Sequence, residues 1–477
     1  MLIQVPNSFS MFRQRIALAI RGLTKSTRAG RANRTSLVAV LGRGLSIIGT
    51  LVTIPLVLNH LGVERYGLWT TLTVIFVYLR LADGGVTVGL ITLVSYADGA
   101  GDQHRIKQLF SSAFVVTAWV TLLLLVVALL VGFVDWGRVL NLSDPKLKSE
   151  AAASAVIIIL AIAMGYPASV VRQGRLGLQQ GAAANTWDIA ATLITFAGQL
   201  SIIFFGFGIV ALAAVTAFTP VMVNIASSVH FLTGSGRHFA PSTRLASGST
   251  IRTLFLSGSM FTALTFSQAL SVQIDIVLVA RLMNVGAVTD YSIIQKMLTQ
   301  PLLIVTMYLT AQFPAYGEAL TCGDHSWIAR HFRQTLLVGT FFSILVCGSL
   351  AVFADPIIDL WIGSAIAPSP ILTASMAVYA ITATIANVCT YFFFALGLYR
   401  RVILAHIGMI AINIPLALLL IPRIGSAGAC LATACGYVAT LIIPSLIGFR
   451  SVLRNLPELQ SKALARTHGV QATGHPE

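Results

Sequence analysis

Seven ionisable side chains lie inside long apolar stretches of the sequence: Arg43, Arg80, Asp83, Asp188, Asp275, Lys296 and His406. A charge at the centre of a membrane helix costs about 2.5–3.5 kcal/mol on insertion scales, so such residues normally face a partner or a wet cavity. Cations in this setting can hold an anionic group through charge-assisted hydrogen bonds. The sequence therefore indicates either neutralised ion pairs or a charged cavity within a membrane.

Two pairs of these residues leave both interpretations open. Arg80 and Asp83 are three residues apart and would share one face of a helix, either as a local ion pair or as part of a wet cavity lined by both signs of charge. Asp275 and Lys296 lie on consecutive apolar stretches and allow the same two interpretations. Asp188 lies near the end of its stretch, so we expect it to reach into water.

Gly84 and Gly85 directly follow Asp83 and would loosen the helix at that point, so the helix could bend there during a conformational change.

His406 also lies near the end of its stretch, and we expect it to reach into water. Uncharged polar residues inside the stretches are assigned mostly to hydrogen bonds between helices. They are Gln199, Asn224, Gln268, Gln273, Gln300, Asn387 and Asn413.

The elements that must position these residues are membrane-spanning helices. Of 477 residues, 56% are hydrophobic and only 10% are charged, and the mean hydropathy is +0.85. A soluble domain carries about a quarter charged residues. Stretches of the roughly 20 apolar residues that a span needs occur near 37–58, 67–95, 109–133, 151–171, 186–206, 208–231, 253–280, 288–313, 334–354, 371–394, 402–421 and 425–449. We predict an all-α integral membrane protein with about twelve transmembrane helices.

Positive charges orient these helices. With both termini in the cytoplasm, 22 of the 31 Lys and Arg residues fall in cytoplasmic segments, six fall outside and three lie within spans.

The predicted segments are a basic cytoplasmic N-terminal tail (1–36), an N-lobe with spans 1–6 (37–233), a cytoplasmic linker (234–252), a C-lobe with spans 7–12 (253–449) and a cytoplasmic C-terminal tail (450–477). Apolar residues at helical spacing within 12–23 leave a surface helix and a disordered tail equally open, and we expect the C-terminal tail to be disordered.

Short matches relate the two lobes. The tripeptide Leu-Gly-Leu follows the fourth stretch at 176–178 and the tenth stretch at 396–398. Each half has an even number of spans, so the predicted repeat is parallel, with its axis along the membrane normal.

The sequence gives no indication of catalysis, a metal or a cofactor. Its five cysteines lack metal-site spacing, and there is no Walker motif, no HExxH and no loop long enough for a catalytic domain. The net charge of +15 lies between and beside the apolar stretches, a pattern typical of helix orientation. We therefore predict no enzyme, no catalytic residues, no metal, no cofactor and no nucleic-acid partner.

Four segments resemble the polysaccharide-export, lipid-linked oligosaccharide flippase branch of the multidrug/oligosaccharidyl-lipid/polysaccharide exporter superfamily. They are 54–69 (IPLVLNHLGVERYGLW), 82–85 (ADGG), 359–363 (DLWIG) and 425–433 (GSAGACLAT). Their order and spacing carry the resemblance, which extends over almost the whole chain. It implies two six-helix lobes around a central cavity.

The resemblance further implies a transporter in the bacterial inner membrane. It would flip a polyprenyl-diphosphate-linked oligosaccharide from the cytoplasmic to the periplasmic leaflet by alternating access, for surface polysaccharide biosynthesis. A diphosphate needs cations while it crosses a low-dielectric region, so we expect Arg43, Arg80 and Lys296 to bind it. We expect coupling or gating to use Asp83, Asp275, Gly84 and Gly85. The expected partners are this substrate, membrane lipids, H⁺ or Na⁺, and polysaccharide assembly proteins.

Two other functions stay open. A cation-coupled multidrug exporter of the same superfamily would have a cavity dominated by acidic residues, whereas here three bases meet Asp83, Asp188 and Asp275. A membrane-embedded glycosyl or polyprenyl transferase or polymerase would need a large periplasmic loop, and the longest outer loop, near 134–150, is modest.

Overall fold

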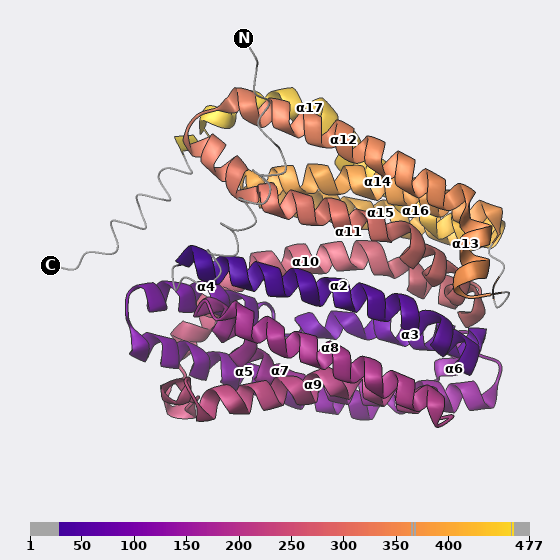
Figure 1. Cartoon of the computed structure of the whole chain (residues 1–477), viewed down its shortest axis with the longest axis horizontal. Coiled ribbons are helices and arrows are strands. Elements are labelled where there is room, and N and C mark those ends of the chain that lie inside the picture. The colour runs from indigo at the N-terminus through magenta and orange to yellow at the C-terminus, as the bar shows by residue number, and fades with distance from the viewer. Residues whose placement is uncertain (1–27, 364–365, 367–368, 459, 462–477) are drawn as a thin grey trace, which may run out of the picture. The chain divides into compact units, whose positions relative to one another are not determined.

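The structure, a computed structural model, describes residues 28–363, 366, 369–458 and 460–461. The segment 12–23, for which a surface helix and a disordered tail stayed open, and most of the C-terminal tail lie outside these residues. The described part of the chain is all-helical and contains no strand (Figure 1).

The chain divides into two compact units, which are described separately. Unit 1 comprises the residues up to His60 together with Leu79–Val134 and Ala152–Thr262. Unit 2 comprises Leu61–Tyr78, Asp135–Ala151 and the chain from Ala263 onward. The lobes 37–233 and 253–449 therefore remain a prediction, because the compact units follow other boundaries.

The longer helices that lie wholly or mainly in unit 1 are α2 (Arg28–Leu61), α4 (Val86–Gly99), α5 (Gln103–Val131), α7 (Pro145–Gly177), α8 (Gly181–Phe204) and α9 (Ile209–Thr233). The short turns η1 (Tyr78–Leu81), η2 (Arg237–Phe239) and η3 (Thr243–Leu245) lie between helices, and α10 (Gly248–Leu282) begins in unit 1 and ends in unit 2.

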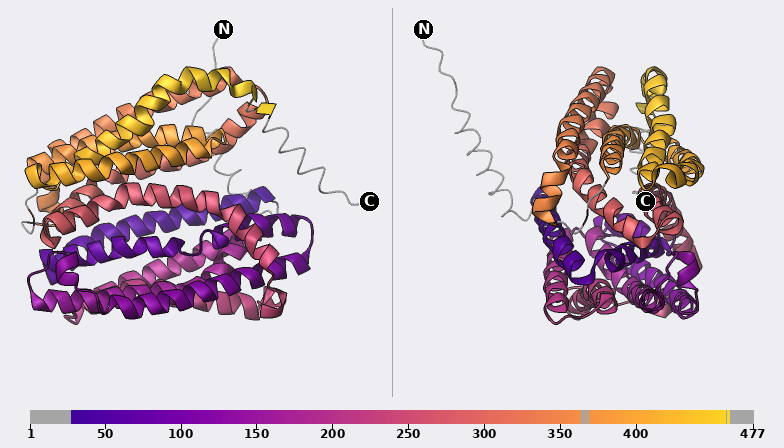
Figure 2. Two further views of the ribbon diagram at one scale, coloured as in Figure 1. Left: turned by 180° about the vertical axis from the view of Figure 1, so that it is seen from behind. Right: turned by 90° about the vertical axis from the view of Figure 1, so that its right-hand side faces the viewer.

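The helices of unit 2 are α3 (Val63–Val77), α6 (Trp136–Val139), α11 (Val285–Thr321), α12 (His325–Val352), α13 (Ala354–Trp361), α14 (Pro370–Ala395), α15 (Tyr399–Ile424), α16 (Ala427–Tyr437), η4 (Val438–Ile442) and α17 (Ile443–Arg454). Figure 2 shows how α16 and α17 continue one another at the C-terminal end. Helix α17 extends past residue 450, into the segment predicted as a tail.

Each of the twelve predicted spans coincides with a helix or a broken helix. Nine helices in the described residues are long and apolar enough to cross a membrane, and two bent helix pairs raise that number to eleven. Helix α11, which carries Lys296, corresponds to the remaining predicted span. The prediction of an all-α, multi-pass membrane protein is confirmed.

The outward face of α5 shows why lipid must surround this fold. Trp119, Leu123, Val126 and Leu130 follow one another at helical spacing and are 55–68% exposed. A contiguous apolar stripe of this kind would be a liability in water, but it matches the hydrocarbon of a bilayer.

Unit 1 is held by a buried cluster that joins α4, α5, α7 and α10, including Leu90, Phe110, Val170 and Leu254. Helices α4 and α10 also meet backbone to backbone. A Cβ added at Gly258 would collide with the carbonyl oxygen of Gly85, so only glycine fits this contact.

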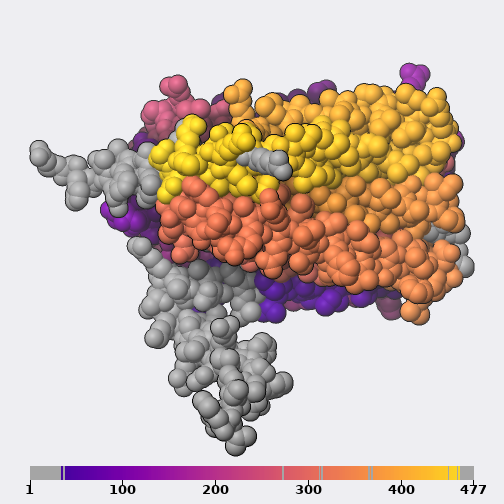
Figure 3. All heavy atoms as spheres, turned by 90° about the horizontal axis from the view of Figure 1, so that it is seen from above, coloured from indigo at the N-terminus to yellow at the C-terminus, as the bar shows by residue number. Residues whose placement is uncertain are grey.

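Unit 2 has an aromatic centre, where the Phe332 ring lies 4.2 Å from Phe392 and 4.9 Å from Phe449 between ring centroids. Helix α3 packs closely on α11, because a Cβ at Gly67 would collide with the carbonyl oxygen of Val285. Figure 3 looks onto the face of unit 2 that the C-terminal third of the chain, coloured orange to yellow, covers.

The second predicted span is broken. The stretches Val63–Leu81 and Val86–Gly99 meet at 46°, and the turn between them holds Gly84 (φ +60°) and Gly85 (φ +93°). Positive φ values of this kind favour glycine. Helix α3, before the turn, belongs to unit 2, and α4, after it, belongs to unit 1.

Candidate functional site

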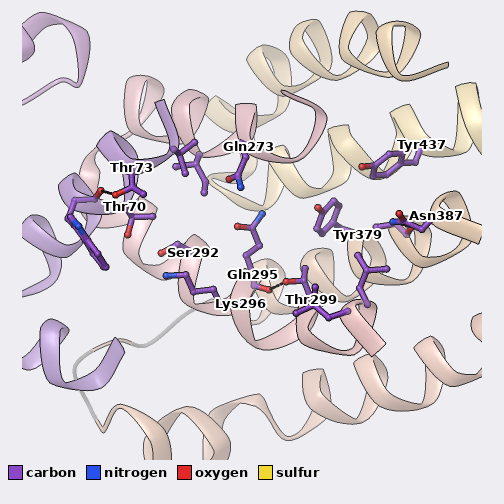
Figure 4. A pocket seen from close by; sticks show the side chains of 16 residues that line it. Thr70, Thr73, Gln273, Ser292, Gln295, Lys296, Thr299, Tyr379, Asn387 and Tyr437 are labelled. Carbon is purple, nitrogen blue, oxygen red and sulfur yellow. Dashed lines mark hydrogen bonds between the residues drawn. The ribbon is translucent and has the colours of Figure 1, made fainter. Parts of the chain in front are cut away.

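Unit 2 contains a cavity of about 410 Å³, here called the Lys296 cavity, formed by α3, α10, α11, α14 and α16 (Figure 4). Its volume lies within the usual range for small-molecule sites. Its lining residues are Trp69, Thr70, Thr73, Val74, Gln273, Ile276, Ser292, Gln295, Lys296, Thr299, Leu302, Leu303, Tyr379, Ala383, Asn387 and Tyr437. Lysine is the only charged residue type in this lining, which has no carboxylate.

Lys296 is fixed by a neighbouring aromatic ring. Its Nζ donates a hydrogen bond of 2.9 Å to the Tyr66 hydroxyl, and it lies 5.3 Å from the centroid of the same ring. An ammonium group has three donors, so donors remain for a ligand. Because Tyr66 is uncharged, this contact leaves the positive charge of Lys296 uncompensated.

The other polar groups of the cavity are neutral. Two of them, Gln295 Nε2 and Thr70 Oγ1, are buried and have no hydrogen-bond partner in the described part of the chain. Figure 4 shows the amides of Gln273 and Gln295 turned toward each other. Unmatched buried donors cost about 1–3 kcal/mol each, so this cavity suits a ligand rich in hydroxyl or carbonyl oxygen.

Asp275 lies in the same unit and is 1% exposed. Its Oδ1 accepts from Asn413 Nδ2 (3.1 Å), and its Oδ2 accepts from Thr433 Oγ1 (2.5 Å) and the Tyr291 hydroxyl (3.1 Å). These three partners come from α15, α16 and α11. A carboxylate is therefore held by neutral donors alone at the meeting point of four helices.

Asp275 and Lys296 do not form the ion pair that their positions in the sequence allow. In the described residues, ion pairs within 4.0 Å join Arg65 to Glu150, Arg138 to Asp135 and Arg172 to Asp188. The physical reason is that each group already has its own partners: three neutral donors surround the carboxylate, and the Tyr66 hydroxyl accepts from the ammonium group.

Unit 1 contains a second cavity, of about 380 Å³, here called the Arg80 cavity. It is formed by η1, α4, α7 and α9. Its lining residues are Arg80, Thr87, Ile158, Ala161, Ile162, Gly165, Tyr166, Ser169, Arg172, Gln173, Ala217, Pro220, Val221 and Asn224. Arg80 and Lys296, which the sequence assigned to one substrate path, thus line separate cavities in separate units.

Arg80 and Asp83 do not form the local ion pair that the sequence left open. The α-helix ends before Asp83, so the three-residue spacing no longer places the two side chains on one helical face. Asp83 is buried and instead satisfies a first-turn donor of α4: its Oδ2 accepts from the backbone nitrogen of Thr87 (2.8 Å) and from Thr87 Oγ1 (2.6 Å).

The two residues expected to reach into water at span ends behave differently. Asp188 keeps 35% of its side chain exposed and also accepts from Arg172 Nη2 at 2.6 Å. The expectation is wrong for the other residue. His406 is 4% exposed, and its Nδ1 lies 2.9 Å from the Val402 carbonyl oxygen one helical turn earlier. Packing of the unit 2 helices therefore covers the histidine that the linear sequence places near a span end.

Arg43 lies exposed on α2 in unit 1 and lines neither cavity. Gly84 and Gly85 form the break in span 2. Interhelical hydrogen bonding is confirmed for Asn413 and for Gln199, which accepts from Thr53. It is wrong for Asn224 and Asn387, because each donates to a carbonyl oxygen one turn earlier in its own helix.

Sequence reasoning missed most of the cavity lining. Tyr379 lies within an apolar stretch and gives no signal of its own. Arg172 reads as a loop charge in the sequence, although it lines the Arg80 cavity. Lys296 stands out as a charge inside a span, and Gln273 and Asn387 stand out as polar residues inside spans; these signals mark positions in the Lys296 cavity.

A family model described as "Polysaccharide biosynthesis protein" matches residues 33–320, well over half of the chain. No curated protein matches the chain.

Solved structures of MOP superfamily transporters share the fold. An inward-facing multidrug resistance MATE family transporter aligns at a TM-score of 0.73 with 12% identity, covering 88% of this chain and 99% of that one. The MATE multidrug transporter DinF-BH aligns at a TM-score of 0.64 with 17% identity, covering 88% of this chain and 95% of that one.

A MOP superfamily transporter from Pyrococcus furiosus, described as having a binding pocket of reverse polarity that suggests a different function, aligns at a TM-score of 0.60 with 13% identity, covering 92% of this chain and 98% of that one. At these identities the likeness concerns the fold.

Proposed function

The chain belongs to the polysaccharide biosynthesis protein family, and from this premise we propose that it flips a polyprenyl-diphosphate-linked oligosaccharide across a bacterial inner membrane. Transport would run from the cytoplasmic to the periplasmic leaflet by alternating access and would supply surface polysaccharide biosynthesis. Both termini would lie in the cytoplasm.

The lining of the Lys296 cavity is the observation that carries this proposal. Trp69 offers an apolar ring face, whereas Tyr379 and Tyr437 are buried in the wall behind it, and the amides of Gln273 and Gln295 offer paired donors and acceptors. A sugar ring presents apolar C–H faces and a rim of hydroxyl groups, so this combination matches it. Lys296 would add a cation for the diphosphate.

The same lining argues against the multidrug alternative. A lipophilic cation needs a carboxylate or a free aromatic cage, and the Lys296 cavity has no lining carboxylate and already holds an ammonium group. Asp275 is a buried carboxylate of the same unit, but three neutral donors occupy it. We propose that it couples transport to H⁺ or Na⁺ instead of binding substrate.

Transport into proteoliposomes tests the proposal. Vesicles loaded with fluorescently tagged, polyprenyl-diphosphate-linked oligosaccharide would be scored for access of a membrane-impermeant glycan-modifying enzyme. We expect flipping by the wild type and a loss of about tenfold or more in Gln295→Ala and Trp69→Ala, because each removes a sugar contact.

Arg400→Gln provides the matched control, since Arg400 is exposed at the start of α15 and lines neither cavity. It should flip at the wild-type rate. Wild-type vesicles that export a lipophilic cation dye but leave the oligosaccharide in place would favour the multidrug function and overturn this one.

A further inference from the structure

We propose that the Arg80 cavity of unit 1 is a separate binding site for a phosphoester group. The ligand's phosphate would come either from the diphosphate of the transported lipid or from the headgroup of an anionic phospholipid. The inference depends on the proposed function only for the first of these sources.

The charge of the lining is the first argument. Arg80 and Arg172 are its only charged side chains, and no carboxylate lines the cavity. Arg80 makes no hydrogen bond or ion pair with any residue that the structure describes. A guanidinium presents a planar fork of donors that matches phosphate oxygens two at a time, so an unpaired Arg80 is a ready phosphate ligand.

Arg172 offers a second, partly available guanidinium. It contacts Asp188 through Nε at 3.2 Å and through Nη2 at 2.6 Å, so one edge of the fork is occupied. Its Nη1 has no partner among the described residues. Asp188 belongs to α8 and does not line the cavity, so it contacts Arg172 from the side away from the cavity. Its negative charge partly offsets the positive charge of Arg172 that a ligand would meet.

The backbone that carries Arg80 is fixed in place. The Tyr166 hydroxyl donates to the Leu79 carbonyl oxygen (2.5 Å) and accepts from the Ala82 backbone nitrogen (2.9 Å). These two anchors flank Arg80 on both sides. Tyr166 is therefore a positioning residue that holds the guanidinium at the cavity without using the guanidinium's own donors.

A buried acceptor completes the site. Gln173 Oε1 is buried and has no hydrogen-bond partner in the described chain. A hydroxyl on the sugar next to the diphosphate, or a hydroxyl on a phospholipid headgroup, would satisfy it. Two guanidinium groups and one acceptor around a volume of about 380 Å³ thus fit a phosphoester carrying a polar neighbour.

Ligand binding by purified full-length protein tests this site directly. Native mass spectrometry would measure the affinity for three probes: undecaprenyl diphosphate, phosphatidylglycerol and phosphate-free undecaprenol. We expect binding of at least one phosphate-bearing probe to weaken about ten- to a hundredfold in Arg80→Gln, with partial recovery in Arg80→Lys. Binding of undecaprenol should not change.

Asp188→Asn gives a result that a purely structural role would not produce. It frees Arg172 from its carboxylate, so affinity for the phosphate-bearing probe should rise several-fold, although the fold loses an ion pair. Tyr166→Phe should weaken binding while Arg400→Gln leaves it unchanged. Preference for the diphosphate identifies the transported lipid as the ligand, and preference for phosphatidylglycerol identifies a resident phospholipid.

Equal affinities of wild type, Arg80→Gln and Asp188→Asn for both phosphate-bearing probes would overturn the assignment. This readout involves no transport. If the protein binds phosphate at this site but does not flip oligosaccharide, only the proposed function is refuted. If the protein flips oligosaccharide but does not bind phosphate at this site, only the site is refuted.

Discussion

At the scale of single residues, Asp275 and Lys296 form hydrogen bonds with separate partners. Asp275 is bound by Tyr291, Asn413 and Thr433, whereas Lys296 is bound by Tyr66. We predict that Asp275→Asn impairs transport and that adding Lys296→Gln gives no rescue, because groups without a shared contact have nearly additive effects. Transport rates of the two single variants and the double variant, normalised to the amount inserted, measure this coupling. Recovery in the double variant would show that the two charges compensate each other in another conformation.

A second prediction at this scale concerns the contact between Lys296 and Tyr66. Tyr66→Phe removes the hydroxyl that accepts from Nζ but keeps the ring 5.3 Å away. We expect Tyr66→Phe to retain most transport, since water or substrate oxygen can replace one acceptor, and Lys296→Gln to lose about tenfold or more because the charge is gone. Initial transport rates at several substrate concentrations distinguish the two. Equal losses in both variants would mean that the hydroxyl, and not the charge, is what the cavity needs.

At the scale of elements, the break in span 2 depends on glycine for two reasons. Gly85 has φ +93°, and a Cβ there would collide with Thr262 Oγ1 and lie 2.7 Å from the Gly258 carbonyl oxygen. We predict that Gly85→Ala and Gly258→Ala each lower the melting temperature and the transport rate, because an L-residue strains the turn by about 1–3 kcal/mol and the added methyl forces α4 from α10. Gly44→Ala is the control: Gly44 is helical, and a Cβ there meets nothing within 4 Å. Thermal unfolding in detergent measures the difference, and a Gly85→Ala protein as stable as Gly44→Ala would show that the turn relaxes freely.

At the scale of the whole molecule, charge placement predicts the topology. With 22 of 31 basic residues in the segments assigned to the cytoplasm, we expect a reporter inserted in the 234–252 linker to be active in the cytoplasm and one inserted near Asn141 to be active in the periplasm. An alkaline phosphatase and green fluorescent protein pair at each site measures both sides. Periplasmic activity at the linker would contradict the twelve-span arrangement, because one span more or fewer inverts every later loop.

The sequence by itself determined the class of protein and the order of its helices. Apolar length decides whether a helix crosses a bilayer, so all twelve stretches were readable, as was the glycine pair after Asp83, since positive φ values favour glycine. Resemblance of short segments such as 61–69 was enough to indicate the family. None of this information depends on which helices touch.

Only the tertiary structure decided which polar residues meet. Arg80 and Lys296 look equivalent in sequence, yet they line different cavities, because a side chain's neighbours come from helices distant along the chain. Tyr379 and Arg172 became cavity residues for the same reason. The Asp83 carboxylate accepts from the first turn of α4 and does not pair with Arg80. Helix α4 begins at this point because the chain turns at Gly84 and Gly85. Burial and hydrogen-bond partners are properties of packing, and linear spacing does not encode them.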